Sequence, residues 1–198
     1  MLDVLLLERP GEHCFYFERH PLAKPAAEKT HKKSGRLHRT RNALRKSYEA
    51  LESKLPIEER LCSNLRNHEG ITLHVPSHVS PDAATRLFLS FLKKCVKTHR
   101  RWLLADGVLA ALGATLVWLP GPNIFFLYPA IRALGHYYAQ AGGSKHQKPK
   151  GLTVQHCALL DGFPRLSVPE MMVKSEEIES KFGFNQLGSF LRKKYGAQ

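Results

Sequence analysis

Apolar positions concentrate in one block near the middle of the chain, residues 102–143. Between Trp102 and Ile131 the only charged side chain is Asp106. The block is interrupted by a turn-forming run, Pro120, Gly121, Pro122 and Asn123. Proline and glycine end helices, so this run predicts a turn between two apolar helices. The first apolar helix is the second half of a long helix predicted over 81–119, and the second is a separate helix predicted over 124–140. A helix that is apolar all round is typical of a buried or a membrane position.

Shorter periodic segments flank this hairpin. Aromatic and branched runs on either side of Pro10 and Gly11 predict a β-hairpin, and two later segments, 70–76 and 152–160, predict strands. Helical spacing predicts further helices over 36–55, 57–67, 175–182 and 186–194. The sequence therefore predicts a mainly helical α+β fold with a few short strands toward both ends. It divides into a basic α/β region (1–79), the long helix with its apolar hairpin (80–143), and a C-terminal strand with short helices (144–198).

The first arm of the hairpin is a marginal membrane span. Residues 102–119 would extend about 27 Å as a helix, against about 30 Å for the hydrocarbon part of a bilayer. Trp102 and Trp118 stand near its ends, where interfacial aromatic residues are common. The second arm carries Arg132, so it spans only if that side chain faces protein. The hairpin is thus either inserted in or associated with a membrane, or the centre of a soluble helical domain.

Charge favours anionic partners. The chain has 30 Lys and Arg against 17 Asp and Glu, a formal net charge of +13. Basic side chains lie directly before the apolar block, at Lys93, Lys94, Lys97, Arg100 and Arg101, and are dense over 24–46. Such clusters beside an apolar segment are typical of contact with anionic lipid. Binding to nucleic acid is the alternative, since phosphate needs only clustered cations, but no RNA- or DNA-binding signature supports it.

The hairpin also holds the candidate chemistry. When its arms are reflected about the turn, Asp106 lies opposite His136 and Tyr137, with Arg132 about one helical turn away. We therefore take Asp106, Arg132, His136 and Tyr137 as a candidate ion- or proton-coupled site. The alternative is that these polar side chains simply lie at a membrane interface.

Other chemistry finds little support. The four cysteines are widely spaced, which predicts four reduced thiols, and neither they nor the histidines show the spacing of a metal site. The chain has no phosphate-binding loop, nucleophile elbow or zinc-protease motif, so we expect no cofactor and no enzymatic activity. The N-terminus resembles neither a signal peptide nor a transit peptide.

Residues 119–128 and 131–142 resemble the signature of the mitochondrial potassium–proton exchange-related family, with its apolar helix, Pro-Gly-Pro-Asn turn, aromatic residues, Arg and His/Tyr pair. The resemblance implies a protein of the inner mitochondrial membrane or of a bacterial inner membrane. The lack of a presequence favours a bacterial member. A single hydrophobic segment argues against a complete carrier, which normally needs many helices.

We therefore expect a membrane-associated accessory or oligomeric component of potassium–proton exchange, that is, of cation homeostasis. Its expected partners are anionic membrane lipids and further copies or other subunits. The alternative is a basic nucleic-acid-binding or soluble interaction protein with a helical-hairpin core.

Overall fold

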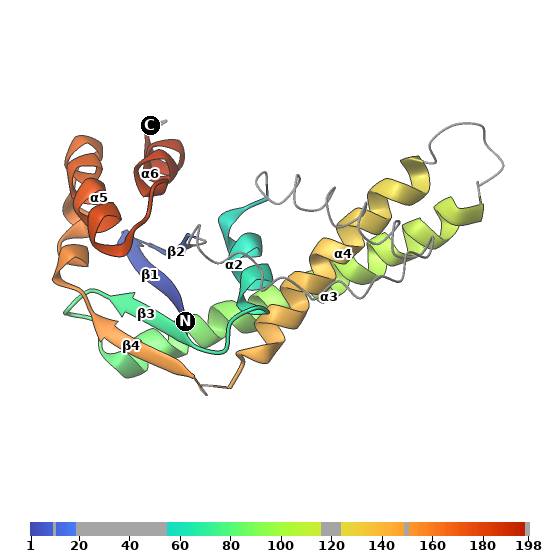
Figure 1. Ribbon diagram of the computed structural model, residues 1–198, viewed down its shortest axis with the longest axis horizontal. Helices are drawn as coiled ribbons and strands as arrows, with labels where there is room; N and C mark the ends of the chain where they lie inside the picture. Colours follow the sequence, from blue (N-terminus) through green and yellow to red (C-terminus); the bar gives the residue numbers. More distant parts are fainter. Residues whose placement is uncertain (10, 19–54, 116–123, 149–150, 197–198) are drawn as a thin grey trace, which may run out of the picture. The chain divides into compact units, whose positions relative to one another are not determined.

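The computed structural model describes residues 1–9, 11–18, 55–115, 124–148 and 151–196 (Figure 1). The basic segment 24–46, most of the helix expected over 36–55 and the turn 120–123 lie outside the described residues. Secondary structure follows the chain in this order: β1 (Leu2–Arg9), β2 (Glu12–Phe17), α2 (Ile57–Leu65), β3 (Ile71–Val75), α3 (Pro81–Thr115), α4 (Ile124–Lys145), β4 (Leu152–His156), η1 (Ala158–Leu160), η2 (Phe163–Arg165), α5 (Val168–Phe182) and α6 (Leu187–Tyr195). The predicted α+β class, mainly helical, is confirmed.

The chain forms two compact units that interleave in sequence. The first comprises residues 1–26, 68–89 and 149–198, and the second comprises residues 27–67 and 90–148. Helix α3 contributes its first turns to one unit and its remainder to the other.

The first unit is built on a four-stranded sheet in the order β2-β1-β3-β4. Strands β1 and β2 pair in antiparallel fashion, and the turn between them uses Gly11 at a positive φ of 79°, which glycine adopts at little cost. Strand β3 lies parallel to both β1 and β4. All four strands occur where the sequence predicts them, but the last ends at His156 and is followed by a 3₁₀ turn rather than continuing to residue 160.

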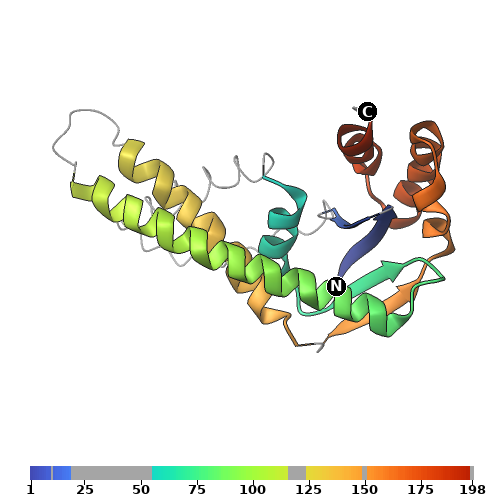
Figure 2. The same ribbon diagram turned by 180° about the vertical axis from the view of Figure 1, so that it is seen from behind.

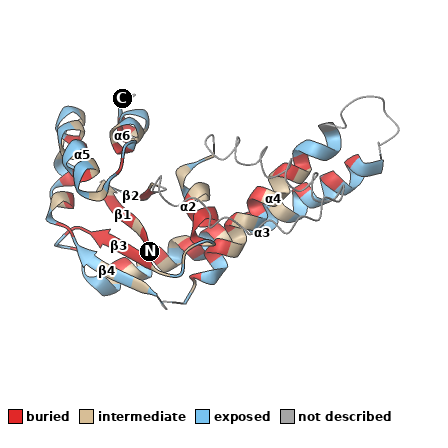
Figure 3. Ribbon diagram, in the orientation of Figure 1, coloured by how far each residue is buried: buried red, intermediate tan, exposed pale blue. Residues whose placement is uncertain are grey.

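Helices cover both faces of this sheet, which explains why most side chains on both faces of the central strands, β1 and β3, are buried (Figures 2 and 3). Phe15 of β2 contacts Phe88 of α3, with ring centroids 5.2 Å apart. Its neighbour Tyr16 points to the opposite face, where it contacts Phe184 and Phe190, from the α5–α6 connection and α6. Adjacent residues of one strand thus secure the two helical layers.

Helix α5 begins seven residues earlier than the sequence analysis expects, and its start has a local cause. The backbone N–H of Ser167 donates to the Glu170 carboxylate at 2.8 Å, and Pro169 occupies the first turn. This is a capping-box sequence, which satisfies N–H groups at a helix start. Gly183, at φ 67°, then ends the helix.

The second unit comprises α2, the rest of α3, and α4, the last two lying side by side as an antiparallel pair (Figures 1 and 2). The second arm is longer than the range 124–140 predicted from the sequence, because α4 continues through Gly142 and Gly143 to Lys145. Their small size serves packing instead: a Cβ at Gly142 would overlap the Cys62 carbonyl oxygen of α2, and one at Gly143 would lie 2.8 Å from a Val96 methyl. Pro129 lies inside α4 without ending it.

A disulfide between Cys62 and Cys95 joins α2 to α3. The expectation of four reduced thiols is therefore wrong for this pair, while Cys14 and Cys157 are buried thiols. The pair could not be predicted from the spacing of the cysteines, because 33 residues separate them and only the packing of the two helices brings the sulfurs together.

Within the ranges given above, no helix combines the length and apolar character needed to cross a membrane. The apolar helix pair is present, but its predicted insertion into a membrane gains no support from this finding.

Candidate functional site

One face of α3 carries a line of polar and aromatic side chains inside the second unit. His99, Trp102 and Asp106 are spaced by three and four residues, so the helical period places them on the same face. His99 is only 8% exposed and Asp106 only 4%. Because buried ionisable groups are costly unless they have partners, this face indicates a specific arrangement with the neighbouring helices.

Helix α4 supplies partners for Asp106. Arg132 and His136 stand one turn apart, with the Arg132 Nε 3.4 Å and the His136 Nε2 3.3 Å from the Asp106 Oδ2. The carboxylate is thus held between a guanidinium and an imidazole. The Asp106 Oδ2 and the His136 Nε2 are both fully buried, and the 3.3 Å contact between them is not aligned as a hydrogen bond.

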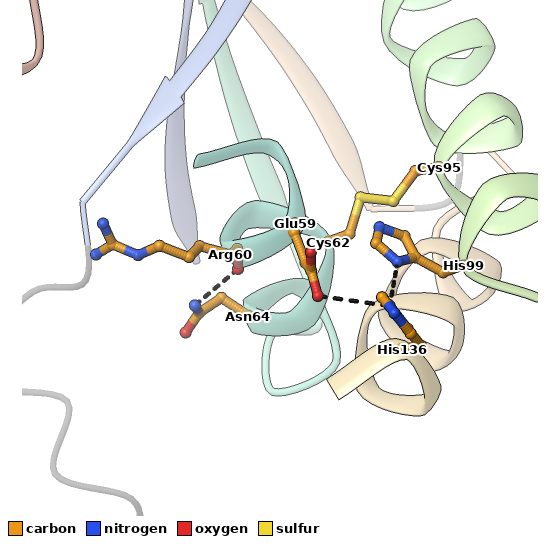
Figure 4. Close-up of a disulfide and its surroundings, with 7 residues drawn as sticks. All are labelled: Glu59, Arg60, Cys62, Asn64, Cys95, His99 and His136. Atoms are coloured by element: carbon orange, nitrogen blue, oxygen red, sulfur yellow. Dashed lines mark hydrogen bonds and ion pairs between the residues drawn. A yellow bond between two sulfur atoms is a disulfide. The ribbon is translucent and has the colours of Figure 1, made fainter. Parts of the chain in front are cut away.

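The other nitrogen of the His136 ring faces α3 and α2 (Figure 4). Its Nδ1 lies 2.9 Å from the Nδ1 of His99 and 3.6 Å from the Glu59 Oε1. Glu59 precedes Cys62 by three residues on α2, and Cys95 precedes His99 by four on α3, so the disulfide lies next to this contact. Three helices therefore each direct one ionisable side chain to the same point.

Burial determines the charge of these groups. It lowers the pKa of His99 to about 4, with a further lowering from His136. The pKa of His136 is also lowered by burial and by Arg132, although Asp106 opposes this. Both imidazoles are consequently neutral near pH 7. Burial raises the pKa of Glu59, and the positive charge of Arg132 opposes that rise.

Aromatic rings surround Arg132 on its more exposed side. Its guanidinium lies 5.7 Å from the Trp102 ring centroid and 5.9 Å from that of Tyr128, within the range of cation–π attraction. The Trp102 ring also stacks beside His136, with centroids 6.4 Å apart. Arg132, whose side chain is 39% exposed, thus lies where the polar cluster meets the surface.

The structure brings together three of the four residues of the candidate ion- or proton-coupled site, Asp106, Arg132 and His136. Tyr137 is not among them: it is 53% exposed, and its ring contacts Tyr138. The cluster includes His99 and Glu59, which the sequence analysis misses. The spacing of His99, Trp102 and Asp106 along one helical face is a signal that could have found His99, whereas Glu59 has none.

The basic side chains before the apolar block form a surface of their own. Lys93, Lys97, Arg100 and Arg101 line a hollow of about 450 Å³ together with Val96, Leu104 and Gln147. Lys94 is exposed on the same helix. We call these five cations the basic band of α3.

The arrangement offers two kinds of chemistry. Asp106, Arg132 and His136 form a charge cluster within the helix pair. On the other side of His136, donor atoms of Glu59, His99 and His136 all lie within 4.8 Å of one another, close enough to share a metal ion.

Comparison with known proteins gives one match. No curated protein and no solved structure matches the chain. The family model described as mitochondrial K+-H+ exchange-related matches residues 39–148, more than half of the chain. The matched range contains the basic band and every residue of the polar cluster. The chain therefore belongs to the mitochondrial K+-H+ exchange-related family.

Proposed function

We propose that this protein is a membrane-associated accessory component of potassium–proton exchange, acting at the inner mitochondrial membrane or a bacterial inner membrane. The observation that carries the proposal is a large set of exposed apolar side chains on the α3–α4 pair. They are Trp102, Leu104, Val108, Leu109 and Leu112 on α3, and Phe125, Phe126, Leu127, Tyr128 and Tyr137 on α4, each 41–65% exposed. Exposed apolar patches of this kind mark membrane or protein interaction sites. We call these residues the apolar end of the helix pair.

The basic band favours a lipid surface as the partner. It lies on α3 directly before the apolar end, and Leu104 belongs to both the hollow of the band and the apolar end. An apolar surface bordered by Lys and Arg is the pattern of helices that lie in the interface of an anionic membrane. Each cation near such a surface contributes about 1 kcal/mol.

The same observations favour lipid over nucleic acid. Cations alone would satisfy phosphates in either partner, but single-stranded nucleic acid needs aromatic rings that stack with bases between the cations. The basic band contains none between Lys93 and Arg101. The aromatic residues lie beyond it, at the apolar end.

An accessory role fits the architecture better than transport by a single copy. Transport sites normally lie between several membrane helices, near the middle of the bilayer. In this proposal Asp106, Arg132 and His136 are the candidate ion-coupled residues, and further subunits complete the exchange machinery. The helix pair supplies the contact with the membrane.

Polar substitutions at the apolar end should weaken vesicle binding. We expect Val108→Asn/Leu112→Gln to weaken binding to anionic vesicles at least about tenfold, since each buried aliphatic side chain contributes roughly 1.5–3 kcal/mol. Flotation with phosphatidylglycerol-containing vesicles measures this. Val173→Gln is the matched control, because Val173 is 65% exposed on α5 in the other unit. Equal flotation of all three proteins would contradict the proposal.

Charge removal from the basic band should act in the same direction. The variant Lys97→Gln/Arg100→Gln/Arg101→Gln should bind anionic vesicles about 100-fold more weakly, at about 1 kcal/mol per cation, with a smaller loss at high salt. Gel shifts with RNA and DNA at the same ionic strength test the alternative partner. Tight binding to nucleic acid without binding to vesicles would contradict the membrane proposal. Self-association that excludes vesicles would contradict it as well.

A further inference from the structure

The geometry points to a divalent transition-metal site formed by Glu59, His99 and His136, best suited to Zn²⁺. This inference goes beyond the proposed function and does not depend on it. The three residues come from α2, α3 and α4, and their donor atoms converge within 4.8 Å. Figure 4 shows the Glu59 carboxylate and the two imidazoles directed at one another beside the disulfide.

The donor separations fit one small ion. Ligands at about 2.0–2.2 Å from a tetrahedral Zn²⁺ lie about 3.3 Å from one another. The His99 and His136 Nδ1 atoms are 2.9 Å apart, and the Glu59 Oε1 lies 3.6 Å from the His136 Nδ1. These two separations lie on either side of the expected value, and all three donor atoms lie within 4.8 Å of one another.

Asp106 lies where an outer-shell partner of His136 would stand. It lies 3.3 Å from the His136 Nε2, the nitrogen opposite the proposed ligand atom. A ligating histidine commonly donates its second N–H to a carboxylate, which fixes the tautomer and makes the imidazole a better ligand. With Nε2 protonated and Nδ1 bound to a metal, both buried nitrogens of His136 would have partners.

The surrounding charges permit a divalent ion. Among the described residues, Glu59 and Asp106 are the acids at the cluster, and the cation Arg132 contacts Asp106 and opposes the rise in the pKa of Glu59.

The donor set also selects the type of ion. Two imidazoles with one carboxylate suit Zn²⁺ and similar first-row ions, whereas Mg²⁺ and Ca²⁺ prefer oxygen ligands. Potassium, a hard cation, is likewise a poor match for two nitrogen donors. Three protein ligands leave a fourth position open, and the ion would connect α2, α3 and α4.

Titration of the full-length protein with Zn²⁺ in the absence of thiol reductant tests the inference, with Co²⁺ as a spectroscopic substitute. We expect stoichiometric binding, a rise in Tm, and Co²⁺ absorption typical of a low-coordinate site. His136→Gln and His99→Gln should lose binding, and Asp106→Asn should weaken it about 10–100-fold. His78→Gln is the matched control, because His78 is exposed and lies in the other unit.

X-ray absorption on the Zn²⁺-loaded wild type keeps the test valid even if a histidine variant fails to fold. A shell of nitrogen and oxygen donors that includes two imidazoles supports the site. Absence of binding in the wild type, or binding that survives both histidine variants, would overturn it. A sulfur shell that disappears in Cys62→Ser/Cys95→Ser would also overturn it, since that assigns the metal to the cysteines.

Discussion

Replacing Gly142 by alanine should destabilise the second unit by about 3 kcal/mol, although alanine favours helix by up to about 1 kcal/mol over glycine. The reason is steric: a Cβ at this position would overlap the carbonyl oxygen of Cys62. Backbone atoms on rigid helices cannot turn aside as a flexible side chain can. The α2–α4 contact would therefore have to separate, and neighbouring contacts such as that of the His146 Nε2 with the Leu65 carbonyl, at 3.0 Å, would weaken.

Gly107→Ala provides the matched control. Gly107 lies in α3, and a Cβ there meets no atom within 4 Å. The same substitution should therefore stabilise the protein by up to about 1 kcal/mol through helix propensity alone. Chemical denaturation of the two variants measures the contrast. Similar free energies of unfolding for both would show that α2 does not pack against α4 as described.

Arg132→Gln should be the more damaging of the two single substitutions at the ion pair, at about 2–3 kcal/mol. It leaves the Asp106 carboxylate, only 6% exposed, without its cation. Asp106→Asn should cost less, about 1 kcal/mol, because the Arg132 side chain is 39% exposed and can turn to water or to the rings of Trp102 and Tyr128.

The double variant Asp106→Asn/Arg132→Gln should be more stable than Arg132→Gln alone, since no buried charge is left without a partner. Thermal unfolding of the four proteins under one condition completes the cycle. Strictly additive losses would show that the two side chains do not interact, and the charge cluster would then lose its main contact.

Period and turn chemistry explain why much of the fold is readable from sequence. The turn signal at Pro10 and Gly11, the strand predicted over 70–76 and the helix predicted from residue 81 depend on local signals, and β1, β2, β3 and α3 appear where these signals lie. The end of α4 is not local. Gly142 and Gly143 resemble a helix stop, but the neighbouring backbone of α2 and the side chain of Val96 determine their role.

In the candidate site, too, some residues could be predicted from the sequence and others depend on tertiary packing. Reflecting the two arms about their turn brings Asp106 near His136, because antiparallel helices of equal rise keep register. Tyr137, one residue further, points away, since a step of one residue rotates a helix by about 100°. Glu59 joins the cluster through α2, and the Cys62–Cys95 disulfide forms in the same way. Neither has a signal in the spacing of the chain, because packing of a third helix creates both.

Tryptophan fluorescence at Leu112 tests the membrane contact most directly. The chain has two tryptophans, so Trp102→Phe/Trp118→Phe/Leu112→Trp reports from one position of the apolar end. With anionic vesicles whose acyl chains carry bromine, we predict that the tryptophan emission at position 112 shifts to shorter wavelength and is strongly quenched. Both effects should be much weaker in the control protein, in which the single tryptophan replaces Thr98 beside the basic band. Emission from position 112 that stays unshifted and unquenched at saturating lipid would contradict the proposal that the apolar end contacts the membrane.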